Sequence, residues 1–226
     1  MRAVDVLGRL RALRVPAFTT SDAAAAVGLS IEATSQALRR LGTAGLVIPV
    51  RKGLWTTRES PDPLTLSDYV TAPHPSYVSL QSALHLHGMI EQIPNVTYLV
   101  SLGRTARIST RVGTYSVHHL DPQLFGGATM DHRTGVRLAS PEKALVDFLY
   151  LSPARSRLFA RLPELELPAG FSRVDARRWA GRIPSARVRT IVARELDRLL
   201  GARRTRVKAP ERRRRRPAPR ARRPAP

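Results

Sequence analysis

Residues 23–55 read AAAAVGLSIEATSQALRRLGTAGLVIPVRKGLW, and this stretch decides the fold of the N-terminal part of the chain. Gly28 is expected to end an alanine-rich helix in the left-handed conformation that glycine adopts easily. Ser30 is expected to cap the next helix, which the apolar spacing extends over residues 31–44. Two short β-like runs, LVIPV and LWTT, follow this helix, and the basic turn 51–53 joins them.

An additional helix is predicted before this stretch. Apolar residues at helical spacing place it over residues 4–14, and Pro16 ends it. Thr20 or Ser21 is expected to cap the alanine-rich helix that comes next. The order helix, short helix, turn, second helix, small hairpin is typical of a winged helix-turn-helix, a DNA-binding fold.

The second helix of this pattern has two chemically different sides. If Ile31, Leu38 and Leu41 pack inward, with Thr34 or Ser35 completing that side, six residues face outward: Glu32, Ala33, Gln36, Arg39, Arg40 and Thr43. A DNA major groove admits one α-helix, and Gln and Arg suit bidentate contacts with adenine and guanine edges. Arg51 and Lys52, at the tip of the hairpin, are expected to reach the neighbouring backbone or minor groove.

The composition agrees with a polyanionic partner. The chain of 226 residues has a formal net charge of +21, which makes nucleic acid the first candidate and an anionic membrane the second. Cysteine is absent, so disulfides, Cys-based zinc sites and a thiol nucleophile are excluded. There is no run of 18 apolar residues, and the N-terminus lacks the apolar core of a signal peptide. We therefore expect a cytoplasmic protein.

The positive charge gathers at the two ends of the sequence. Residues 1–58 contain nine basic and three acidic residues, a net charge of +6. Residues 203–226 contain twelve basic residues and one acidic residue, Glu211, a net charge of +11. This second segment is also rich in proline and alanine, so we expect a disordered tail over residues 202–226. It is interpreted either as an arm that binds phosphates without reading bases or as a solubilising tail.

We predict an α+β fold. The chain divides into four regions. They are a winged helix-turn-helix domain (1–58), a Pro-rich linker (59–76), a mixed α/β domain (77–201) and the disordered basic tail (202–226). Within the third region we expect a helix over 79–88, strands over 96–102, 113–120 and 135–140, a helix from Ser140, and helices over 173–181 and 185–200.

The helix that begins after Ser140 has strong sequence signals. Ser140 is a good N-cap, and Pro141 and Glu142 suit the first turn. Four apolar residues form its expected buried stripe: Ala144, Leu145, Phe148 and Leu149. Lys143 and Asp147 are spaced as an i,i+4 ion pair.

Metal and cofactor sites find little support in the sequence. His85 and His87 would lie on different sides of one helix, and His118 and His119 on opposite faces of one strand. Other residues that could supplement a metal site have no recognised spacing: His74, His132, Asp131 and Asp121. Phosphate-binding glycine patterns are absent as well. We expect no metal and no cofactor.

A nuclease is the main enzymatic alternative. Asp121, Glu142 and Lys143 are similar to a magnesium-binding D…E-x-K site, but Glu142 and Lys143 are adjacent and diverge by about 100° on a helix. The segment SPEK (140–143) also matches S-x-x-K, without the partner motifs of that enzyme class. We therefore expect a protein that is not an enzyme. A third hypothesis is a nucleoid or RNA-binding protein.

The order of motifs resembles the AbiEi-type antitoxin family of viral-defence transcriptional regulators. The resemblance covers roughly residues 3–200. It rests on the winged-helix pattern, on YVSLQSALHLHGMIEQIP (77–94), on GTYSVHHL (113–120) and LFGG (124–127), and on VRLASPEKALVDFLY (136–150). The arginine-rich tail lies outside it.

The resemblance implies a repressor that binds inverted repeats in its own promoter and an antitoxin domain that antagonises a nucleotidyltransferase-like toxin encoded nearby. Because one domain reads one half-site, we expect a second copy or a homodimer to read the other. The resemblance implies DNA contacts at eight positions: Ser30, Ala33, Thr34, Gln36, Arg39, Arg40, Arg51 and Lys52. It implies no catalytic role for the C-terminal motifs, whose residues are mostly caps and core.

Overall fold

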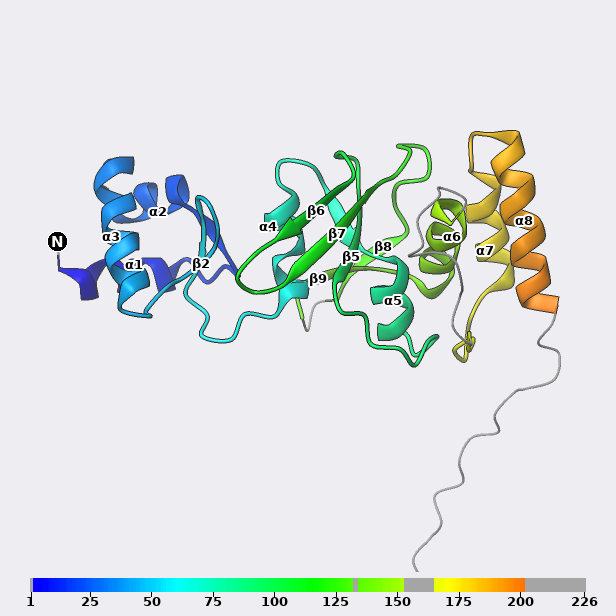
Figure 1. The fold of residues 1–226 in the computed structure, drawn as a ribbon, viewed down its shortest axis with the longest axis horizontal. Coiled ribbons are helices and arrows are strands. Elements are labelled where there is room, and N and C mark those ends of the chain that lie inside the picture. The colour runs from blue at the N-terminus through cyan, green and yellow to red at the C-terminus, as the bar shows by residue number, and fades with distance from the viewer. Residues whose placement is uncertain (1, 132–133, 153–164, 202–226) are drawn as a thin grey trace, which may run out of the picture.

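The computed structural model describes residues 2–131, 134–152 and 165–201. The protein is elongated, and its elements follow one another along the long axis (Figure 1). A small N-terminal unit (residues 2–58) forms one end, a larger mixed sheet lies in the middle, and three helices form the other end. The fold is therefore α+β with a mixed sheet.

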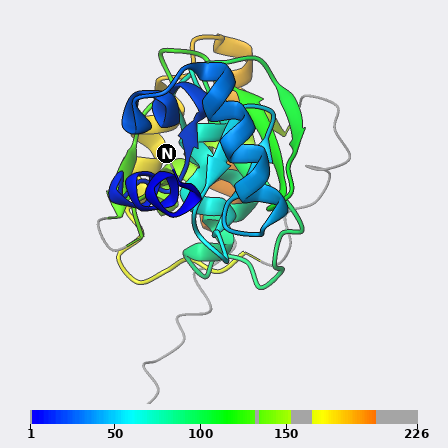
Figure 2. The same cartoon turned by 90° about the vertical axis from the view of Figure 1, so that its left-hand side faces the viewer.

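The N-terminal unit combines three helices with a three-stranded antiparallel sheet. Its elements are α1 (Ala3–Ala12), β1 (Phe18–Thr19), α2 (Thr20–Val27), α3 (Ile31–Thr43), β2 (Ile48–Arg51) and β3 (Leu54–Thr56). The strand order is β1-β3-β2. Figure 2 looks at the molecule from this end, which the helices drawn in blue cover. Side chains from all three helices build the core of the unit around Leu10, Val27 and Leu38.

Local capping explains where α2 and α3 begin and end. The N-cap of α2 is Thr19, which corrects the expectation of Thr20 or Ser21. Thr19 Oγ1 accepts from Asp22 N at 3.1 Å, and Asp22 Oδ2 accepts from Thr19 N at 2.8 Å, a reciprocal capping box. Gly28 ends α2 with φ of +72°, as predicted. Ser30 caps α3 by accepting from Ala33 N at 3.2 Å, also as predicted.

The buried side of α3 differs from the prediction at its first turn. Thr34, Leu38 and Leu41 are buried, whereas Ile31 is 55% exposed and does not pack inward. Ile31 shares the side of Leu38 but lies about 10 Å nearer the helix start, where it lines a surface groove beside Thr20. The core thus covers only the second and later turns of α3.

Residues 59–76, predicted as a Pro-rich linker with one helical turn, contain more helix than expected. They include a 3-10 turn, η1 (Pro63–Leu66), and a short helix, α4 (Ser67–Thr71). Leu66 and Val70 are fully buried in a hydrophobic cluster with the sheet. This apolar pair, at helical spacing, anchors the segment to the sheet.

A six-stranded mixed sheet forms the centre of the second unit (residues 63–201). Its strands are β4 (Ser76–Val78), β5 (Thr97–Ser101), β6 (Ala106–Ser109), β7 (Thr114–His119), β8 (Ala128–Asp131) and β9 (Val136–Ala139). The order is β6-β7-β5-β4-β9-β8, with parallel pairing in β5/β7 and β4/β9. The strands predicted over 96–102, 113–120 and 135–140 are confirmed, whereas β4, β6 and β8 were not predicted.

Four helices complete the second unit, two of them next to the sheet and two at the far end of the molecule (Figure 1). They are α5 (Leu80–Leu86), α6 (Pro141–Leu151), α7 (Arg173–Gly181) and α8 (Ala186–Gly201). All four were predicted, and Ser140 caps α6 by accepting from Lys143 N at 3.2 Å. The predicted buried stripe of α6 is confirmed and joins a hydrophobic cluster with residues of α5, α7 and α8. No helix in the described ranges is long and apolar enough to cross a membrane.

The two units share a hydrophobic cluster. Val50 and Leu54 of the N-terminal hairpin pack with Leu66, Tyr115 and Val117 of the second unit. A backbone hydrogen bond at 3.2 Å, from Arg111 N to Val50 O, also crosses the junction. Packed side chains and a main-chain bond at one junction restrict the motion of one unit against the other. The tail predicted to be disordered, 202–226, lies outside the described residues.

Candidate nucleic-acid interface

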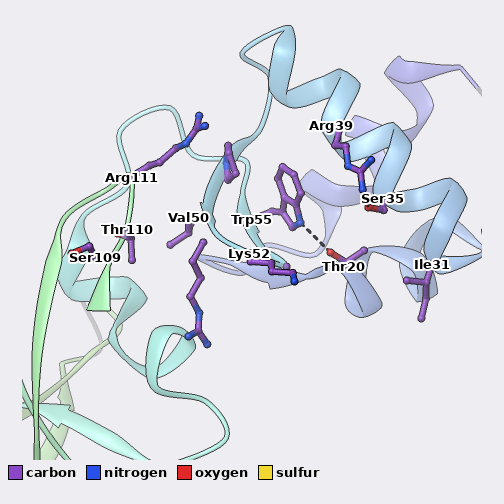
Figure 3. A pocket seen from close by; sticks show the side chains of 13 residues that line it. Thr20, Ile31, Ser35, Arg39, Val50, Lys52, Trp55, Ser109, Thr110 and Arg111 are labelled. Carbon is purple, nitrogen blue, oxygen red and sulfur yellow. Dashed lines mark hydrogen bonds between the residues drawn. The ribbon is translucent and has the colours of Figure 1, made fainter. Parts of the chain in front are cut away.

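A groove of about 680 Å³ opens between α3 and the second unit. One wall is the face of α3 that carries Ile31, Ser35 and Arg39, and the β2–β3 hairpin, residues 49–53, lies next to it. Residues 109–111, at the end of β6 and in the turn between β6 and β7, complete the lining. In Figure 3, Arg111 lies at one end of the groove and Ser35 with Arg39 at the other, with Lys52 and Trp55 between them. We call this feature the basic groove.

The outward side of α3 presents polar and cationic side chains beside the basic groove. All six residues predicted to face outward are exposed: Glu32, Ala33, Gln36, Arg39, Arg40 and Thr43. Arg39 Nη2 donates to Ser35 Oγ at 3.4 Å, which holds the guanidinium along the groove side of the helix. Gln36 and Arg40 are one turn apart on the open surface. This side of α3 thus offers hydrogen-bond donors in a row that faces solvent.

The β2–β3 turn holds two cations at a fixed place next to α3. Arg51 and Lys52 are exposed, and Gly53 adopts a φ of +76° that closes the turn. Thr20 N donates to Gly53 O at 3.0 Å, and Trp55 Nε1 donates to Thr20 Oγ1 at 3.1 Å. These bonds tie the hairpin to the start of α2, so the two cations keep their position relative to α3.

A fourth cation of the basic groove, after Arg39, Arg51 and Lys52, comes from the second unit and was missed by sequence reasoning. Arg111 is exposed in the β6–β7 turn. It lies about 60 residues after the hairpin in sequence, and only the pairing of the unpredicted strand β6 with β7 brings it there. The glycine-ended turn TRVG (110–113) was the one local signal.

Within the described ranges, no ion pair involves the cations around the groove: Arg39, Arg40, Arg51, Lys52 and Arg111. Exposed cations that are not held in ion pairs keep their positive potential available to an anion. Glu32, one turn before Gln36 and also exposed, is the acidic side chain on this face of α3. The groove and its rim are therefore a surface of predominantly positive charge.

The structure corrects one of the eight DNA-contact positions that the family resemblance implied. Thr34 is 0% exposed and lies on the side of α3 that carries Leu38 and Leu41, so it cannot touch a ligand of this surface. Its Oγ1 is buried and makes no hydrogen bond among the described residues. Ser30 and Ala33 are exposed at the start of α3, where the Ser30 hydroxyl is engaged as the cap.

The histidines weighed as metal ligands make contacts of their own. His87 Nε2 lies 2.7 Å from Ala139 O, and His119 Nδ1 lies 3.0 Å from Gly103 O. His118 is half-buried, contacts Ser116 Oγ at 3.0 Å through Nε2, and has its pKa lowered by burial. Among the described residues, no three His, Cys, Asp or Glu side chains are grouped so that they could hold a metal ion. His132 lies outside the described ranges.

The residues of the nuclease hypothesis are committed to other contacts. Glu142 Oε1 accepts from Ser172 N at 2.8 Å, and Asp121 Oδ1 accepts from Gln123 N at 2.8 Å. Lys143 is completely buried and pairs with Asp147. Burial and pairing thus keep Lys143 away from a substrate in solvent, and Glu142 is 8% exposed, unlike the open carboxylates that hold a catalytic magnesium ion.

The Lys143–Asp147 pair is the centre of a closed polar cluster, and it confirms the predicted i,i+4 spacing. Both side chains are 0% exposed. Asp147 Oδ2 accepts from Ser79 Oγ at 2.8 Å and from Tyr77 Oη at 3.1 Å. Lys143 Nζ lies 5.1 Å from the ring centroid of Trp179, a cation–π distance. The partners come from β4, the N-cap of α5, α6 and α7, so the cluster joins four elements.

Burial controls the protonation of this cluster. It raises the pKa of Asp147 and lowers that of Lys143, and the attraction between the two opposes both shifts. The pKa of Tyr77 is also raised, first by burial and then by the neighbouring Asp147. Because the charged pair is enclosed and its carboxylate is hydrogen-bonded, we assign the cluster a structural role. The exposed cations of the basic groove are the candidate functional site.

No protein-family model matches the chain, and no curated protein matches it. The resemblance to the AbiEi-type family, which rests on short motifs, therefore stays a prediction.

Proposed function

We propose that residues 1–58 form a winged helix-turn-helix domain and that the protein is a transcriptional repressor that binds duplex DNA. The order α1, β1, α2, α3, β2, β3 and the antiparallel sheet β1-β3-β2 support this assignment. In this reading α2 and α3 are the helix-turn-helix pair, α3 enters the major groove, and the β2–β3 hairpin is the wing.

The observation that carries the proposal is the exposed side of α3. Gln36, Arg39 and Arg40 are free to reach base edges, with the arginines suited to guanine and the glutamine to adenine. Ile31, which is exposed at the start of the helix, adds an apolar surface of the kind that contacts a thymine methyl group. One α3 reads one half-site, and a second copy of the chain reads the other half of an inverted repeat.

The cations of the wing supply affinity instead of sequence information. Arg51 and Lys52 are exposed at its tip and are held there by the bonds of the turn to Thr20. Their contacts fall on phosphates or in the minor groove beside the base-reading helix. The net charge of +6 over residues 1–58 agrees with a partner of high negative charge.

We propose further that the second unit acts as the antitoxin of a toxin–antitoxin pair. This part of the proposal is supported only by the motif resemblance over 77–94 and 136–150. Expression of the adjacent gene with and without this protein tests it. A growth defect that the full chain relieves, and that residues 1–58 alone do not, is the expected result.

The DNA-binding proposal is tested by fluorescence anisotropy with two duplexes, one from the region upstream of its own gene and one of shuffled sequence. The full chain is expected to bind the upstream duplex more tightly. Arg39→Ala and Arg40→Ala should each lose about 1–3 kcal/mol on the upstream duplex and much less on the shuffled one. Arg137→Ala, which removes an exposed arginine from β9, is the matched control.

Two results would defeat parts of this proposal. Equal losses on both duplexes would show that the two arginines contact phosphates and read no bases. Equal affinity of the unaltered protein for upstream and shuffled DNA, or a preference for RNA, would favour the nucleoid or RNA-binding hypothesis.

A further inference from the structure

The turn between β6 and β7 brings an arginine of the second unit to the basic groove. The turn follows Ser109, which pairs with Thr114 across the hairpin, and its tip is Arg111. Figure 1 shows this hairpin reaching from the central sheet toward the N-terminal unit. Residues 109–111 line the groove together with Arg39 and Lys52.

The turn is held in one shape by its own hydrogen bonds. Thr110 N and Thr110 Oγ1 both donate to Gly113 O, at 3.0 Å and 2.7 Å. Thr110 Oγ1 also accepts from Val112 N at 3.2 Å and from Gly113 N at 3.1 Å. A cation on a turn of this kind loses little conformational entropy from its backbone when it binds.

The place of the turn relative to the wing is fixed as well. Arg111 N donates to Val50 O at 3.2 Å, so the backbone of Arg111 lies beside the residue that precedes Arg51. Val112 packs against the cluster that contains Val50 and Leu54. The bond to Val50 uses only the main chain of Arg111. The side chain of Arg111 takes no part in this bond.

The side chain of Arg111 is exposed and, within the described ranges, belongs to no ion pair. It lies at the opposite end of the groove from Arg39, beyond the wing (Figure 3). An exposed guanidinium in this setting keeps its charge available to an anion along the same surface.

We propose that the β6–β7 turn is a third DNA-contacting element, in which Arg111 binds a backbone phosphate beyond the wing. This inference rests on the proposed DNA-binding function. It gives the second unit a direct part in DNA binding, and it extends the contacted duplex on the wing side of α3. Because a phosphate contact carries no base information, Arg111 contributes affinity to every duplex equally.

The test is a salt titration of the full chain with the upstream and shuffled duplexes. A single phosphate contact scales the binding constant with salt to a power of about −0.9. Arg111→Ala should therefore bind both duplexes roughly fivefold more weakly at about 0.15 M salt and lower the slope of log K against log[salt] by about 0.9. Arg111→Lys, which keeps the charge, should retain most of the affinity, and Arg137→Ala should match the unaltered protein.

The outcomes separate this inference from the function on which it rests. If Arg111→Ala binds like Arg137→Ala, or if it loses affinity on the upstream duplex alone with an unchanged salt slope, the phosphate contact is refuted while the DNA-binding function stands. If the unaltered chain binds neither duplex, the proposed function fails and this inference fails with it. A thermal unfolding curve of each variant shows that the comparison is between folded proteins.

Discussion

The cations of the basic groove and the cation at the centre of the second unit carry the same charge in opposite surroundings. Arg39, Arg51, Lys52 and Arg111 are exposed, and no ion pair of the described residues involves them. Lys143 is fully buried, pairs with Asp147 and lies against the rings of Tyr77 and Trp179. Water solvates the first group, whereas protein groups must solvate the second.

The difference shows what each charge can do. Transferring an ion from water into a protein interior costs several kcal/mol, so a buried ion remains only where partners satisfy it completely. Lys143 and Asp147 are therefore tied to the packing of β4, α5, α6 and α7, and both side chains are 0% exposed and closed to a ligand from solvent. The exposed cations contribute little to folding and keep their charge for a partner.

The largest expected effect comes from breaking the buried pair. Lys143→Met leaves Asp147 unpaired in the core, so the free energy of unfolding should fall by about 3–5 kcal/mol. Urea unfolding measures this loss, and Arg39→Ala, on the exposed surface, is the control that should change stability by no more than about 0.5 kcal/mol. The double variant Lys143→Met/Asp147→Leu should recover most of the loss. A loss below about 1 kcal/mol for Lys143→Met would contradict the structural role of the pair.

Substitutions of the two exposed cations in the β2–β3 hairpin are expected to have a moderate effect on DNA binding and no effect on stability. Removal of both charges, by Arg51→Ala and Lys52→Ala together, should lower the salt slope of DNA binding by about 1.8, because each phosphate contact contributes about 0.9. Anisotropy titrations at several salt concentrations measure the slope. An unchanged slope would show that the wing does not contact phosphates.

A smaller, stabilising effect is expected at Thr34. Its buried hydroxyl has no hydrogen-bond partner among the described residues, so Thr34→Val removes an unsatisfied polar group while preserving shape. The free energy of unfolding should rise by about 1 kcal/mol, and the affinity for DNA should not change. If Thr34→Val binds DNA more weakly and has unchanged stability, Thr34 contacts DNA after all.

The smallest effect is expected at His118. This side chain is half-buried, between the exposed cations of the groove and the fully buried Lys143. Burial lowers the pKa of His118 below the ordinary 6.5, so the unfolded chain takes up the proton first. The contribution of His118 to stability is present above about pH 6.5 and is lost as the pH falls from there through the lowered pKa. The free energy of unfolding of the unaltered protein and of His118→Gln, each determined at about pH 7.5 and about pH 5, measures this contribution. If His118→Gln loses as much stability on acidification as the unaltered protein, His118 does not contribute to the pH dependence.

Sequence reasoning succeeded where the signal is local. The caps Ser30 and Ser140, the glycine turn at Gly28 and the apolar stripe of α6 predicted α3 and α6 nearly to the residue. Each of these signals lies within a few residues of the element that it defines, so one stretch of sequence contains it whole.

The rest depends on contacts between distant parts of the chain. Strands β4, β6 and β8 have three or four residues each and are defined by their neighbours in the sheet. Arg111 reaches the groove only because β6 pairs with β7 and the two units share a cluster. The exposure of Ile31 likewise depends on where the surrounding core ends. The helical spacing of apolar residues predicts the inward side of α3 but not how far along the helix the core extends.

The central claim is that the exposed side of α3 lies in a DNA groove. Because the chain has no cysteine, Gln36→Cys allows a DNA-cleaving reagent to be attached at one position, and Val174→Cys, exposed on α7, provides the distant control. On the upstream duplex, the reagent at position 36 should cut within a few base pairs inside the protein's footprint, and the reagent at position 174 should not. Cutting at position 36 that is dispersed along the duplex, or that matches the control, would contradict the claim.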